Sequence, residues 1–252
     1  MKTIDERFNL KNKVAVVVGG AGFLCSALGR ALAECGVKVC ILDVNENPTA
    51  DRAGYPHDYW ACNVTSKPDI VRVHAEILKK HGRIDILLNG AGINAPTPFL
   101  DIQTDEMNRI LESHVHATLY GCQVFGETML KQKSGSIINF ASASSGPPLS
   151  KAFVYSMAKA GVMNLTQNLA REWGEKGVRV NALRPGFFPT EWSMTHFIDA
   201  DRQAKILGHT PMNRYGKPEE LVGAVLWLAS DAASFVTGSI IAIDGGFTCM
   251  TI

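Results

Sequence analysis

Residues 13–33 read KVAVVVGGAGFLCSALGRALA, and this stretch decides the fold. Its first part, residues 13–18, is a short apolar run without polar alternation, which is typical of a strand buried on both faces. Gly19, Gly20 and Gly22 follow at once, and a helical pattern of apolar residues then continues through Ala33. A strand, a glycine-rich turn and a helix in this order predict a parallel sheet that holds a nucleotide at the turn.

Six more apolar runs of similar length recur along the chain, with helical patterns between them: 37–42, 59–64, 84–88, 136–140, 179–183 and 239–243. Intervening helices cover both faces of a parallel sheet. We therefore predict an α/β fold, a doubly wound, parallel, seven-stranded, Rossmann-like sheet with helices on both faces. No linker, repeat or low-complexity tract divides the 252 residues, so residues 1–252 are expected to form a single dinucleotide-binding and catalytic domain.

Ligands of doubly wound sheets bind outside the carboxyl ends of the strands. Polar or glycine residues stand at six of these predicted ends: Gly19, Asp43, Asn63, Asn89, Ser142 and Pro185-Gly186. The longest stretch without a clear element runs from about 187 to 212. Long loops in compact domains are often binding loops, and this one is predicted to be the substrate loop.

Asp43 indicates which dinucleotide is bound. It ends the second predicted strand, about 20 residues after the glycine-rich turn, where a carboxylate can accept hydrogen bonds from adenosine ribose hydroxyls. The same charge repels a 2'-phosphate, and Val44-Asn45 offers no cation to attract one. These residues favour NAD(H) over NADP(H). The alternative is that Asp43 is a surface residue that opens a loop.

Composition argues against several classes of partner. The formal net charge of +1 gives no reason to expect nucleic acid or an anionic membrane surface. A small-molecule substrate fits better. The six cysteines form no Cys-x-x-Cys pair, so neither a metal site nor a disulfide framework is predicted. The chain has no apolar signal core and no apolar run of about 20 residues, and it is expected to be cytoplasmic.

The chemistry-bearing residues are Ser142, Tyr155 and Lys159. Positions i and i+4 share a helix face, so the Lys159 ammonium can favour the phenolate form of Tyr155 and lower a phenol pKa that is ordinarily about 10. Such a phenol is a usable general acid and base. Ser142 ends a predicted strand, where its hydroxyl can stabilise the oxygen that gains or loses a proton. Taken alone, the Tyr-x-x-x-Lys pattern is more often a solvated helix face.

With Asn89-Gly90-Ala91-Gly92, Pro185-Gly186 and a closing Asp244-Gly245-Gly246 added to these motifs, the chain resembles the short-chain dehydrogenase/reductases over essentially its whole length. The resemblance implies that the tyrosine is the acid/base, the serine orients the reacting oxygen, and the lysine binds the nicotinamide ribose. It also implies a homotetramer formed through helices 104–130 and 152–173. The implied cofactor-binding residues are Gly19, Gly22, Phe23, Leu24, Asp43, Asn63, Val64, Asn89, Ala91, Gly92, Tyr155, Lys159, Pro185, Gly186, Phe188 and Thr190.

The chain departs from the family pattern at three places. The usual Thr-Gly-x-x-x-Gly-x-Gly turn has Val18, Phe23 and Cys25 in place of the threonine and the last two glycines. His114 replaces an asparagine that supports a proton path to the lysine. It could titrate near neutral pH and join that relay as a catalytic residue, or it could fill a packing position. Asn63 stands where an aspartate commonly contacts the adenine.

The Pro-Gly-Phe-Phe-Pro-Thr-Glu segment and the tail resemble the sugar-acid branch, that is, fructuronate or mannonate reductases and gluconate dehydrogenases. A sugar acid needs a cation and several polar groups. Lys151 is the candidate for the carboxylate, and Ser144, Asn94 and the 191–214 region, including Trp192, His196, Arg202 and Arg214, for the hydroxyls; solvated loop positions are the alternative for each. Trp192 also allows another polyol or a steroid-like alcohol. A non-catalytic nucleotide-sensing protein remains the rival from a different class.

Overall fold

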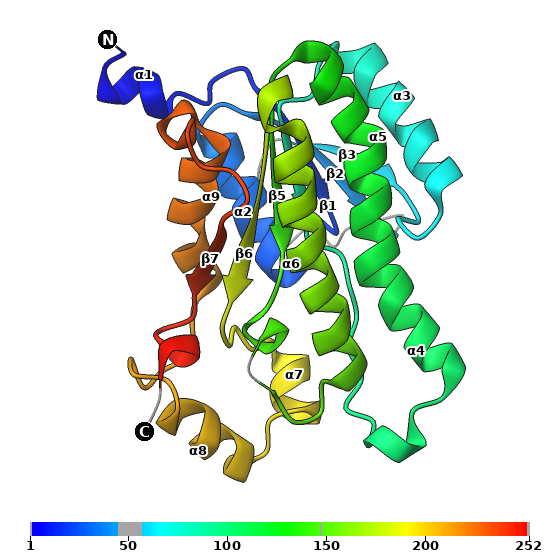
Figure 1. Ribbon diagram of the computed structural model, residues 1–252, viewed down its shortest axis with the longest axis vertical. Coiled ribbons are helices and arrows are strands. Elements are labelled where there is room, and N and C mark those ends of the chain that lie inside the picture. Colours follow the sequence, from blue (N-terminus) through cyan, green and yellow to red (C-terminus); the bar gives the residue numbers. More distant parts are fainter. Residues whose placement is uncertain (1, 45–56, 147, 251–252) are drawn as a thin grey trace.

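The computed structural model describes residues 2–44, 57–146 and 148–250. Its centre is a seven-stranded parallel sheet in the order β3-β2-β1-β4-β5-β6-β7 (Figure 1). This topology confirms the predicted doubly wound fold. The strands are β1 Val14–Val18, β2 Lys38–Asp43, β3 Asp58–Ala61, β4 Ile86–Asn89, β5 Gly135–Phe140, β6 Val178–Pro185 and β7 Ile240–Ile243.

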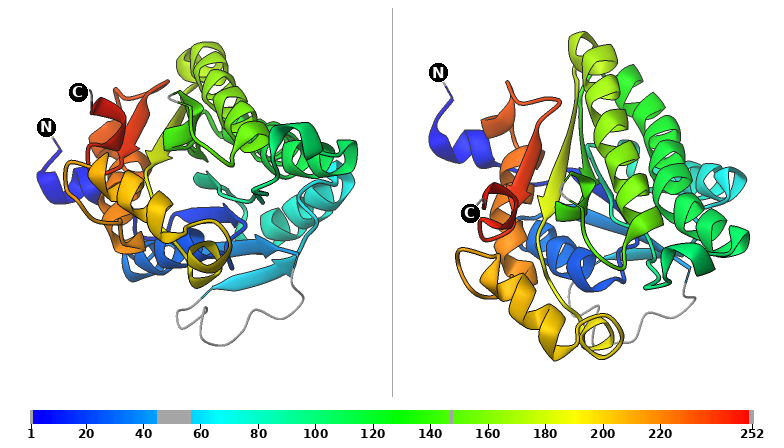
Figure 2. Two further views of the ribbon diagram at one scale, coloured as in Figure 1. Left: turned by 90° about the horizontal axis from the view of Figure 1, so that it is seen from below. Right: turned by 60° about the horizontal axis from the view of Figure 1, so that its bottom comes forward.

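Helices cover both faces of the sheet (Figures 1 and 2). One face carries α3, α5 and α6, and the other carries α2 and α9. None of the described helices is long and apolar enough to cross a membrane. The helices are α1 Ile4–Phe8, α2 Phe23–Glu34, α3 Lys67–His81, α4 Thr104–Leu111, α5 Ala117–Gln132, α6 Phe153–Trp173, α7 Glu191–His196, α8 Ala200–Gly208 and α9 Val222–Ala229.

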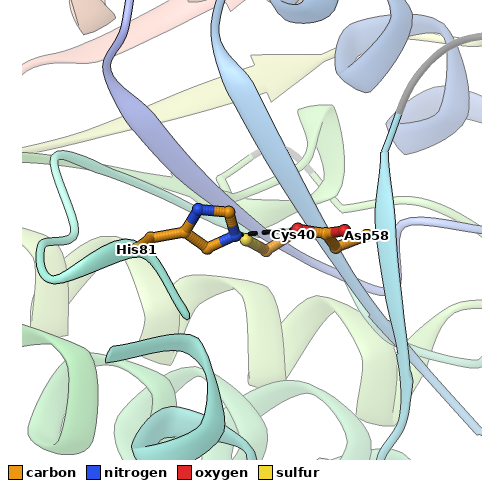
Figure 3. Close-up of side chains that lie close together, drawn as sticks. All are labelled: Cys40, Asp58 and His81. Atoms are coloured by element: carbon orange, nitrogen blue, oxygen red, sulfur yellow. Dashed lines mark hydrogen bonds and ion pairs between the residues drawn. The ribbon is translucent and has the colours of Figure 1, made fainter. Parts of the chain in front are cut away.

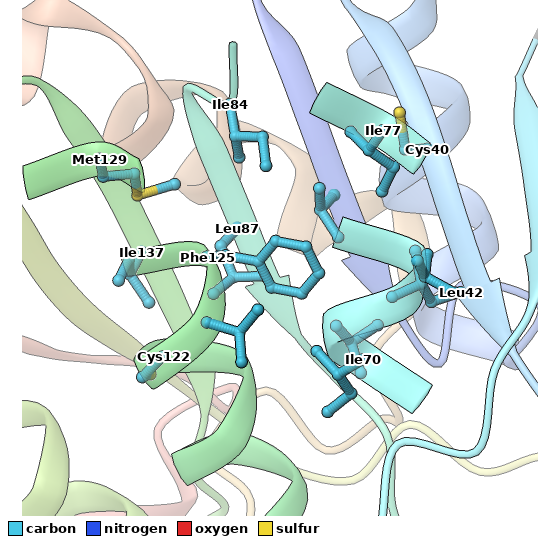
Figure 4. Packing of buried hydrophobic residues seen from close by; sticks show 14 of the residues in the cluster. Cys40, Leu42, Ile70, Ile77, Ile84, Leu87, Cys122, Phe125, Met129 and Ile137 are labelled. Atoms are coloured by element: carbon cyan, nitrogen blue, oxygen red, sulfur yellow. The ribbon is translucent and has the colours of Figure 1, made fainter. Parts of the chain in front are cut away.

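The unalternated strand sequences follow from burial on two faces. In β1, Val16 packs into the core beneath α3 and α5, whereas its neighbour Val17 packs into the core beneath α2 and α9. Phe125 of α5 is fully buried at the centre of the first core, among Ile70 and Leu87 (Figure 4). Because successive strand side chains alternate between faces, both layers require apolar residues in every central strand.

The edge strand β3 is shorter than predicted. It ends at Ala61 rather than at residue 64. The Asn63 side-chain oxygen accepts hydrogen bonds from the Thr65 backbone NH at 3.1 Å and from its hydroxyl at 2.8 Å. This local turn redirects the backbone away from the ladder. An apolar run therefore overstates strand length where a polar residue inside it can bond to its own backbone.

A polar cluster ties β3 to the end of α3 (Figure 3). The side chains of Cys40, Asp58 and His81 bring one potential ligand atom each to within 4.8 Å of one another. His81 Nε2 lies 2.7 Å from the Asp58 carboxylate, and Lys80 also donates to it. Burial opposes ionisation of Asp58, but the hydrogen bonds from Lys80 and His81 outweigh it and lower its pKa. The cluster thus anchors the edge of the sheet through paired charges.

The 187–212 segment contains two short helices, so the expectation of a stretch without elements was wrong. Thr190 caps α7 by accepting a hydrogen bond from the Ser193 backbone NH. Asp199 caps α8 through the Arg202 backbone NH at 2.8 Å. Helices of this length depend on their caps and packing rather than on a long apolar period. Both helices lie at the end of the molecule toward which the strands point (Figures 1 and 2).

The helix over 104–132 is interrupted. A single π-helical turn, Glu112–His116, joins α4 to α5 and carries His114. Such turns are rare and frequently mark functional positions. Here the turn lies on the side of α6 that carries Tyr155, because the rings of His114 and Tyr155 pack edge to face at 5.1 Å.

Candidate active site

Ser142, Tyr155 and Lys159 converge as the sequence predicts. Ser142 follows β5 and starts a 3₁₀ turn, in which its hydroxyl accepts from the Ser144 backbone NH at 3.2 Å. Tyr155 and Lys159 lie on one face of α6, with the ammonium 5.7 Å from the centre of the phenol ring. Ser142 and Tyr155 line the same two cavities, and the serine hydroxyl is near enough to lower the pKa of the phenol. The serine hydroxyl and the phenol therefore border the same space.

The pKa of Tyr155 is not lowered in the protein alone, contrary to the sequence-based expectation. Burial raises it above its ordinary value of 10.0, and the nearby Ser142 hydroxyl opposes that rise. Lys159 does not point at the phenol oxygen but donates to the Phe140 carbonyl at 2.6 Å. Desolvation is therefore the dominant influence on the pKa of the Tyr155 phenol.

Lys159 is a buried cation, with 5% of its surface exposed. Burial lowers its pKa from 10.5 to about 8. At neutral pH the ammonium form still prevails, held by the Phe140 carbonyl. The site therefore contains a positive charge that has little solvent around it and acts strongly on its neighbours.

His114 stays neutral, so the expectation that it titrates near neutral pH was wrong. Burial and the adjacent Lys159 charge hold its pKa well below 6.5, against a weaker opposing hydrogen bond to Ile93. Its Nε2 donates to the Ile93 carbonyl at 2.8 Å, which leaves Nδ1 as an acceptor. Nδ1 is buried without a hydrogen-bond partner among the described residues. A neutral imidazole with an unused acceptor at this depth is suited to receive a proton donor.

The glycine-rich turn joins the end of β1 to the start of α2. Gly19 has φ +72°, and a Cβ on it would lie 2.7 Å from the Ala91 backbone, so only glycine allows β1 and β4 to approach here. Gly22 is the N-cap of α2 and makes no side-chain cap bond. The first backbone NH groups of α2 therefore lack a side-chain acceptor at the positive end of the helix. Phe23 is the first residue of α2 and is 42% exposed.

Asp43 lies beside this turn, at the end of β2. Its carboxylate accepts a hydrogen bond from the Ala21 backbone NH at 3.1 Å. The carboxylate and the glycine-rich turn therefore belong to one site, as the sequence predicts for the ribose and pyrophosphate of a dinucleotide. Asn45, one of the residues from which NAD(H) is predicted over NADP(H), lies outside the described residues.

Two cavities meet at Ser142 and Tyr155. The Lys159 cavity has a volume of about 260 Å³ and also contains Leu24, Gly92 and His114. The Arg202 cavity has a volume of about 330 Å³ and includes Thr190 and Trp192. Both cavities are lined by Asn94, Ser142, Tyr155, Gly186 and Phe188.

The strand-end segment after β6 shapes both cavities. Gly186 packs so closely that a Cβ would lie 2.7 Å from the Asp244 backbone. This contact joins Pro185-Gly186 to the closing Asp-Gly-Gly motif. Phe188 lines the Lys159 cavity and also packs against Gly216. A Cβ on Gly216 would lie 2.4 Å from the Phe188 ring. Three of the predicted cofactor residues of this segment, Pro185, Gly186 and Phe188, line the Lys159 cavity. The fourth, Thr190, lines the Arg202 cavity, and its hydroxyl caps α7.

Three predicted cofactor residues lie elsewhere or are engaged otherwise. Asn89 is buried and donates to Asn139 Oδ1 at 2.8 Å, which ties β4 to β5. Val64 is part of the core beneath α3 and α5. The Asn63 side-chain oxygen is occupied by its turn. The first two therefore stabilise the sheet that supports the site.

The predicted substrate residues lie in different surroundings. Ser144 is buried and its hydroxyl donates to the Ser142 hydroxyl at 3.1 Å, so it positions the predicted catalytic serine. Trp192 lines the Arg202 cavity and stacks on His196 at 4.7 Å. Lys151 pairs instead with Asp199 at 3.3 Å and lines a neighbouring cavity.

Sequence reasoning missed the groups that hold these residues in place. Arg184, near the end of β6, donates to the carbonyls of Ser142 at 3.3 Å and Ala143 at 3.4 Å. The carbonyls of Phe140 and Ile93 orient Lys159 and His114. Of these groups, only Arg184 could have been noticed in the sequence, as a cation just before Pro185-Gly186. The carbonyls could not, because every residue type has one.

This architecture has a match among known families. A family model described as enoyl-(acyl carrier protein) reductase covers residues 23–248. The chain belongs to the short-chain dehydrogenase/reductase family. It is an oxidoreductase of that family, whose cofactor is NAD(P). This membership favours catalysis over the nucleotide-sensing alternative.

Several short-chain dehydrogenase/reductases are similar over their full length. The uncharacterized oxidoreductase UxuB of Bacillus subtilis is 38% identical over 95% of this chain and 96% of its own. A gluconate 5-dehydrogenase of Burkholderia cenocepacia, in complex with NADP and tartrate, has a TM-score of 0.92 and 30% identity over 98% of this chain and 99% of its own. A Haemophilus influenza structure assigned as a D-mannonate oxidoreductase, with bound NAD, has a TM-score of 0.90 and 32% identity over 99% of each chain. These neighbours confirm the resemblance to the sugar-acid branch.

Lys159→Met is expected to stabilise this short-chain dehydrogenase/reductase at neutral pH. Since folding lowers the pKa of Lys159 from 10.5 to about 8, protonation opposes folding by up to about 3 kcal/mol at neutral pH. Methionine removes that penalty but leaves the Phe140 carbonyl unpaired, at a cost of about 1 kcal/mol. Urea denaturation at neutral pH should therefore show a net gain of about 2 kcal/mol.

The size of the stability gain from Lys159→Met depends on pH. The penalty is full below the folded pKa of about 8, shrinks as pH rises and vanishes above the unfolded value of 10.5. The gain should therefore disappear in alkaline buffer. Lys205→Met, at an exposed lysine of α8, is the control and should change stability little. A Lys159→Met protein no more stable than the parent at neutral pH would contradict the buried-charge account.

Proposed function

We propose that this protein transfers hydride between the nicotinamide of NAD(H) and a secondary alcohol or ketone of a sugar acid, of the fructuronate/mannonate or ketogluconate type. The observation that carries the proposal is the meeting of two cavities at Ser142 and Tyr155, one bordered by Lys159 and the other by Trp192. A cofactor on one side and a substrate on the other would then share one proton-handling pair.

The chain's residues fit a bound dinucleotide. The start of α2 has no side-chain cap and can offer its first backbone NH groups to a pyrophosphate, whereas the NH groups of the Gly19–Gly22 turn are used within the protein. Asp43 lies beside that turn, where it can accept from ribose hydroxyls and repel a 2'-phosphate. Lys159 and the unpaired Nδ1 of His114 border the cavity on the nicotinamide side. When bound, the nicotinamide supplies or accepts the hydride.

The protein's part in the reaction concerns the substrate oxygen. In ketone reduction the Tyr155 hydroxyl donates a proton to that oxygen while the Ser142 hydroxyl donates a hydrogen bond to it. In alcohol oxidation the Tyr155 phenolate accepts the proton. The Lys159 ammonium, 5.7 Å from the centre of the phenol ring, is the positive charge available to stabilise that phenolate once it forms. Ser144 and Arg184 hold Ser142 in place through its hydroxyl and its carbonyl.

His114 acts in its neutral form. With Nε2 committed to the Ile93 carbonyl, Nδ1 can accept a hydrogen bond from a water or hydroxyl that also contacts Lys159. This makes His114 a fixed acceptor in the proton path rather than a titrating relay. The π-helical turn positions it for that role.

Two alternatives use the same chemistry. The wall of the Arg202 cavity includes Phe187, Trp192, Phe197 and Ile198, and this apolar surface would also suit a steroid-like alcohol or another apolar ketone. Another polyol would bind through the hydroxyl and amide groups of the Arg202 cavity alone. The relatives that act on sugar acids support the first proposal.

Tyr155→Phe should abolish turnover while leaving cofactor binding intact. Removal of the proton donor is expected to lower kcat/KM by about 10³-fold, measured as loss of NADH absorbance with fructuronate and with 5-ketogluconate, and with apolar ketones for comparison. Titration of NADH fluorescence should give the parent's affinity. A Tyr155→Phe protein with the parent's rate would refute the catalytic assignment; parent activity on apolar ketones alone would favour the second substrate class.

Asp43→Ser should shift the cofactor preference. The parent is expected to use NADH better than NADPH, and removal of the carboxylate should raise the NADPH-to-NADH ratio of kcat/KM about tenfold by relieving repulsion of the 2'-phosphate. Asp5→Ser, in α1 at a distance from the turn, is the matched control and should leave the ratio unchanged. Equal use of both nucleotides by the parent would contradict the NAD(H) proposal.

We also propose that the protein is a homotetramer assembled through α4, α5 and α6. Phe153 and Met157 expose apolar surface on α6, at 48% and 55%, as an interface between subunits would require. Met157→Glu should lower the mass measured by light scattering. Val71→Glu, at an exposed site of α3, is the control. A parent that is monomeric, or a Met157→Glu protein of unchanged mass, would argue against this interface.

A further inference from the structure

Arg202 has an unusual environment at the edge of the active site. It lies on α8, and its Nη2 donates to the Ser150 carbonyl at 2.8 Å. Its Nη1 is buried and has no hydrogen-bond partner among the described residues. A charged donor left unpaired out of water is costly, so Nη1 calls for an acceptor that the described residues do not supply.

The surrounding charges do not supply that acceptor. Asp199 accepts from the Arg202 backbone NH at 2.8 Å and from Lys151 at 3.3 Å, and no described ion pair joins a carboxylate to the guanidinium. Lys205 is occupied by Asp201 at 2.7 Å. Burial lowers the pKa of Arg202, with Asp199 opposing. The guanidinium is thus partly desolvated and keeps bonding capacity.

The Arg202 cavity has one positively charged residue in its described lining and no negatively charged one. Arg202 lines the same cavity as Ser142 and Tyr155, and among the described lining residues it carries the only full charge. The rest of the wall consists of hydroxyl, amide and apolar groups, such as Thr190, Asn94 and Phe197. A cavity with one cation and no acid is complementary to a substrate with one negative charge.

We propose that Arg202 binds the carboxylate of the substrate and makes the enzyme selective for acids over neutral ketoses. This inference rests on the proposed oxidoreductase function and names the residue that recognises its substrate. The planar guanidinium can give a carboxylate a charge-assisted hydrogen bond from Nη1, while Nη2 remains fixed to the Ser150 carbonyl. The carbonyl carbon of the substrate then lies toward Ser142 and Tyr155, across the same cavity.

Arg202 replaces the residue that the sequence suggested for this task. The Lys151 ammonium is already paired with Asp199, and both side chains are well exposed, at 41% and 60%. A solvated pair of that kind contributes little to binding. Lys151 also lines the neighbouring cavity rather than the one with Ser142 and Tyr155. Its pair with Asp199 instead keeps that carboxylate occupied beside Arg202.

Selectivity should therefore depend on one side chain. D-Fructuronate and D-fructose form a matched pair of test substrates, since they differ in a terminal carboxylate against a hydroxymethyl group. The parent should prefer fructuronate. Arg202→Gln should lower kcat/KM for fructuronate about 10²-fold, because the carboxylate loses its partner in a desolvated site. The value for fructose should change less than about threefold. Arg202→Lys should retain part of the preference.

The control is Lys205→Gln, which removes a positive charge from the same helix but does not line this cavity. It should leave both substrates unaffected. Circular dichroism and thermal unfolding establish that each variant is folded. An equal loss on both substrates, no loss on either, or a parent without preference for the acid would overturn the assignment of Arg202.

A binding measurement separates this inference from the proposed function. Calorimetric titration of D-mannonate, with D-mannitol as the neutral counterpart, is made on the parent and on Arg202→Gln with NAD present. Mannonate binding that Arg202→Gln loses would support the carboxylate site even if no ketose were reduced, in which case the function alone would fail. Equal mannonate affinity in the two proteins, or no preference of the parent over mannitol, would refute the site.

Discussion

The hydrogen bond from the buried Lys159 ammonium to the Phe140 carbonyl is the interaction on which the site depends. It fixes α6 against the end of β5, and so places Tyr155 opposite Ser142. The same charge, with burial, keeps His114 neutral and gives its ring one donor and one acceptor. A lysine in this position destabilises the fold while it prepares the chemistry. The two apolar cores on either side of the sheet supply the rigidity that holds it there.

The site is divided by function around that cation. Backbone groups dominate on the proposed cofactor side, at the start of α2 beside Gly19. Side chains dominate on the proposed substrate side, where Trp192 and Arg202 come from the short helices after β6. Such a division lets the sheet retain one chemistry while the segment after β6 varies. Ser142 and Tyr155 belong to both halves, and the reaction is therefore assigned to their shared border.

The sequence predicted the sheet, and it predicted that Tyr155 and Lys159 lie together, because both features follow from short-range rules. Unalternated apolar runs mark buried strands, and Tyr155 and Lys159 share a helix face by spacing alone. The prediction was wrong at β3, where the Asn63 side chain ends the strand, and at α7 and α8, which rely on caps. It was also wrong on the direction of the Tyr155 pKa shift, because burial cannot be read from residue types. The surroundings of Arg202 and the pairing of Lys151 depend on contacts between distant segments, which no local pattern encodes.

The π-helical turn at Glu112–His116 also separates two demands on one helix. One residue more than a regular helix requires is accommodated between α4 and α5. Because the wider turn absorbs that residue, the helix on either side keeps its register, and Phe125 keeps its place in the core. Deleting one residue would restore an ordinary helix but would remove the local distortion that presents His114 to the Lys159 cavity. The extra residue thus adjusts one side chain at the site without disturbing the packing of the helix that follows.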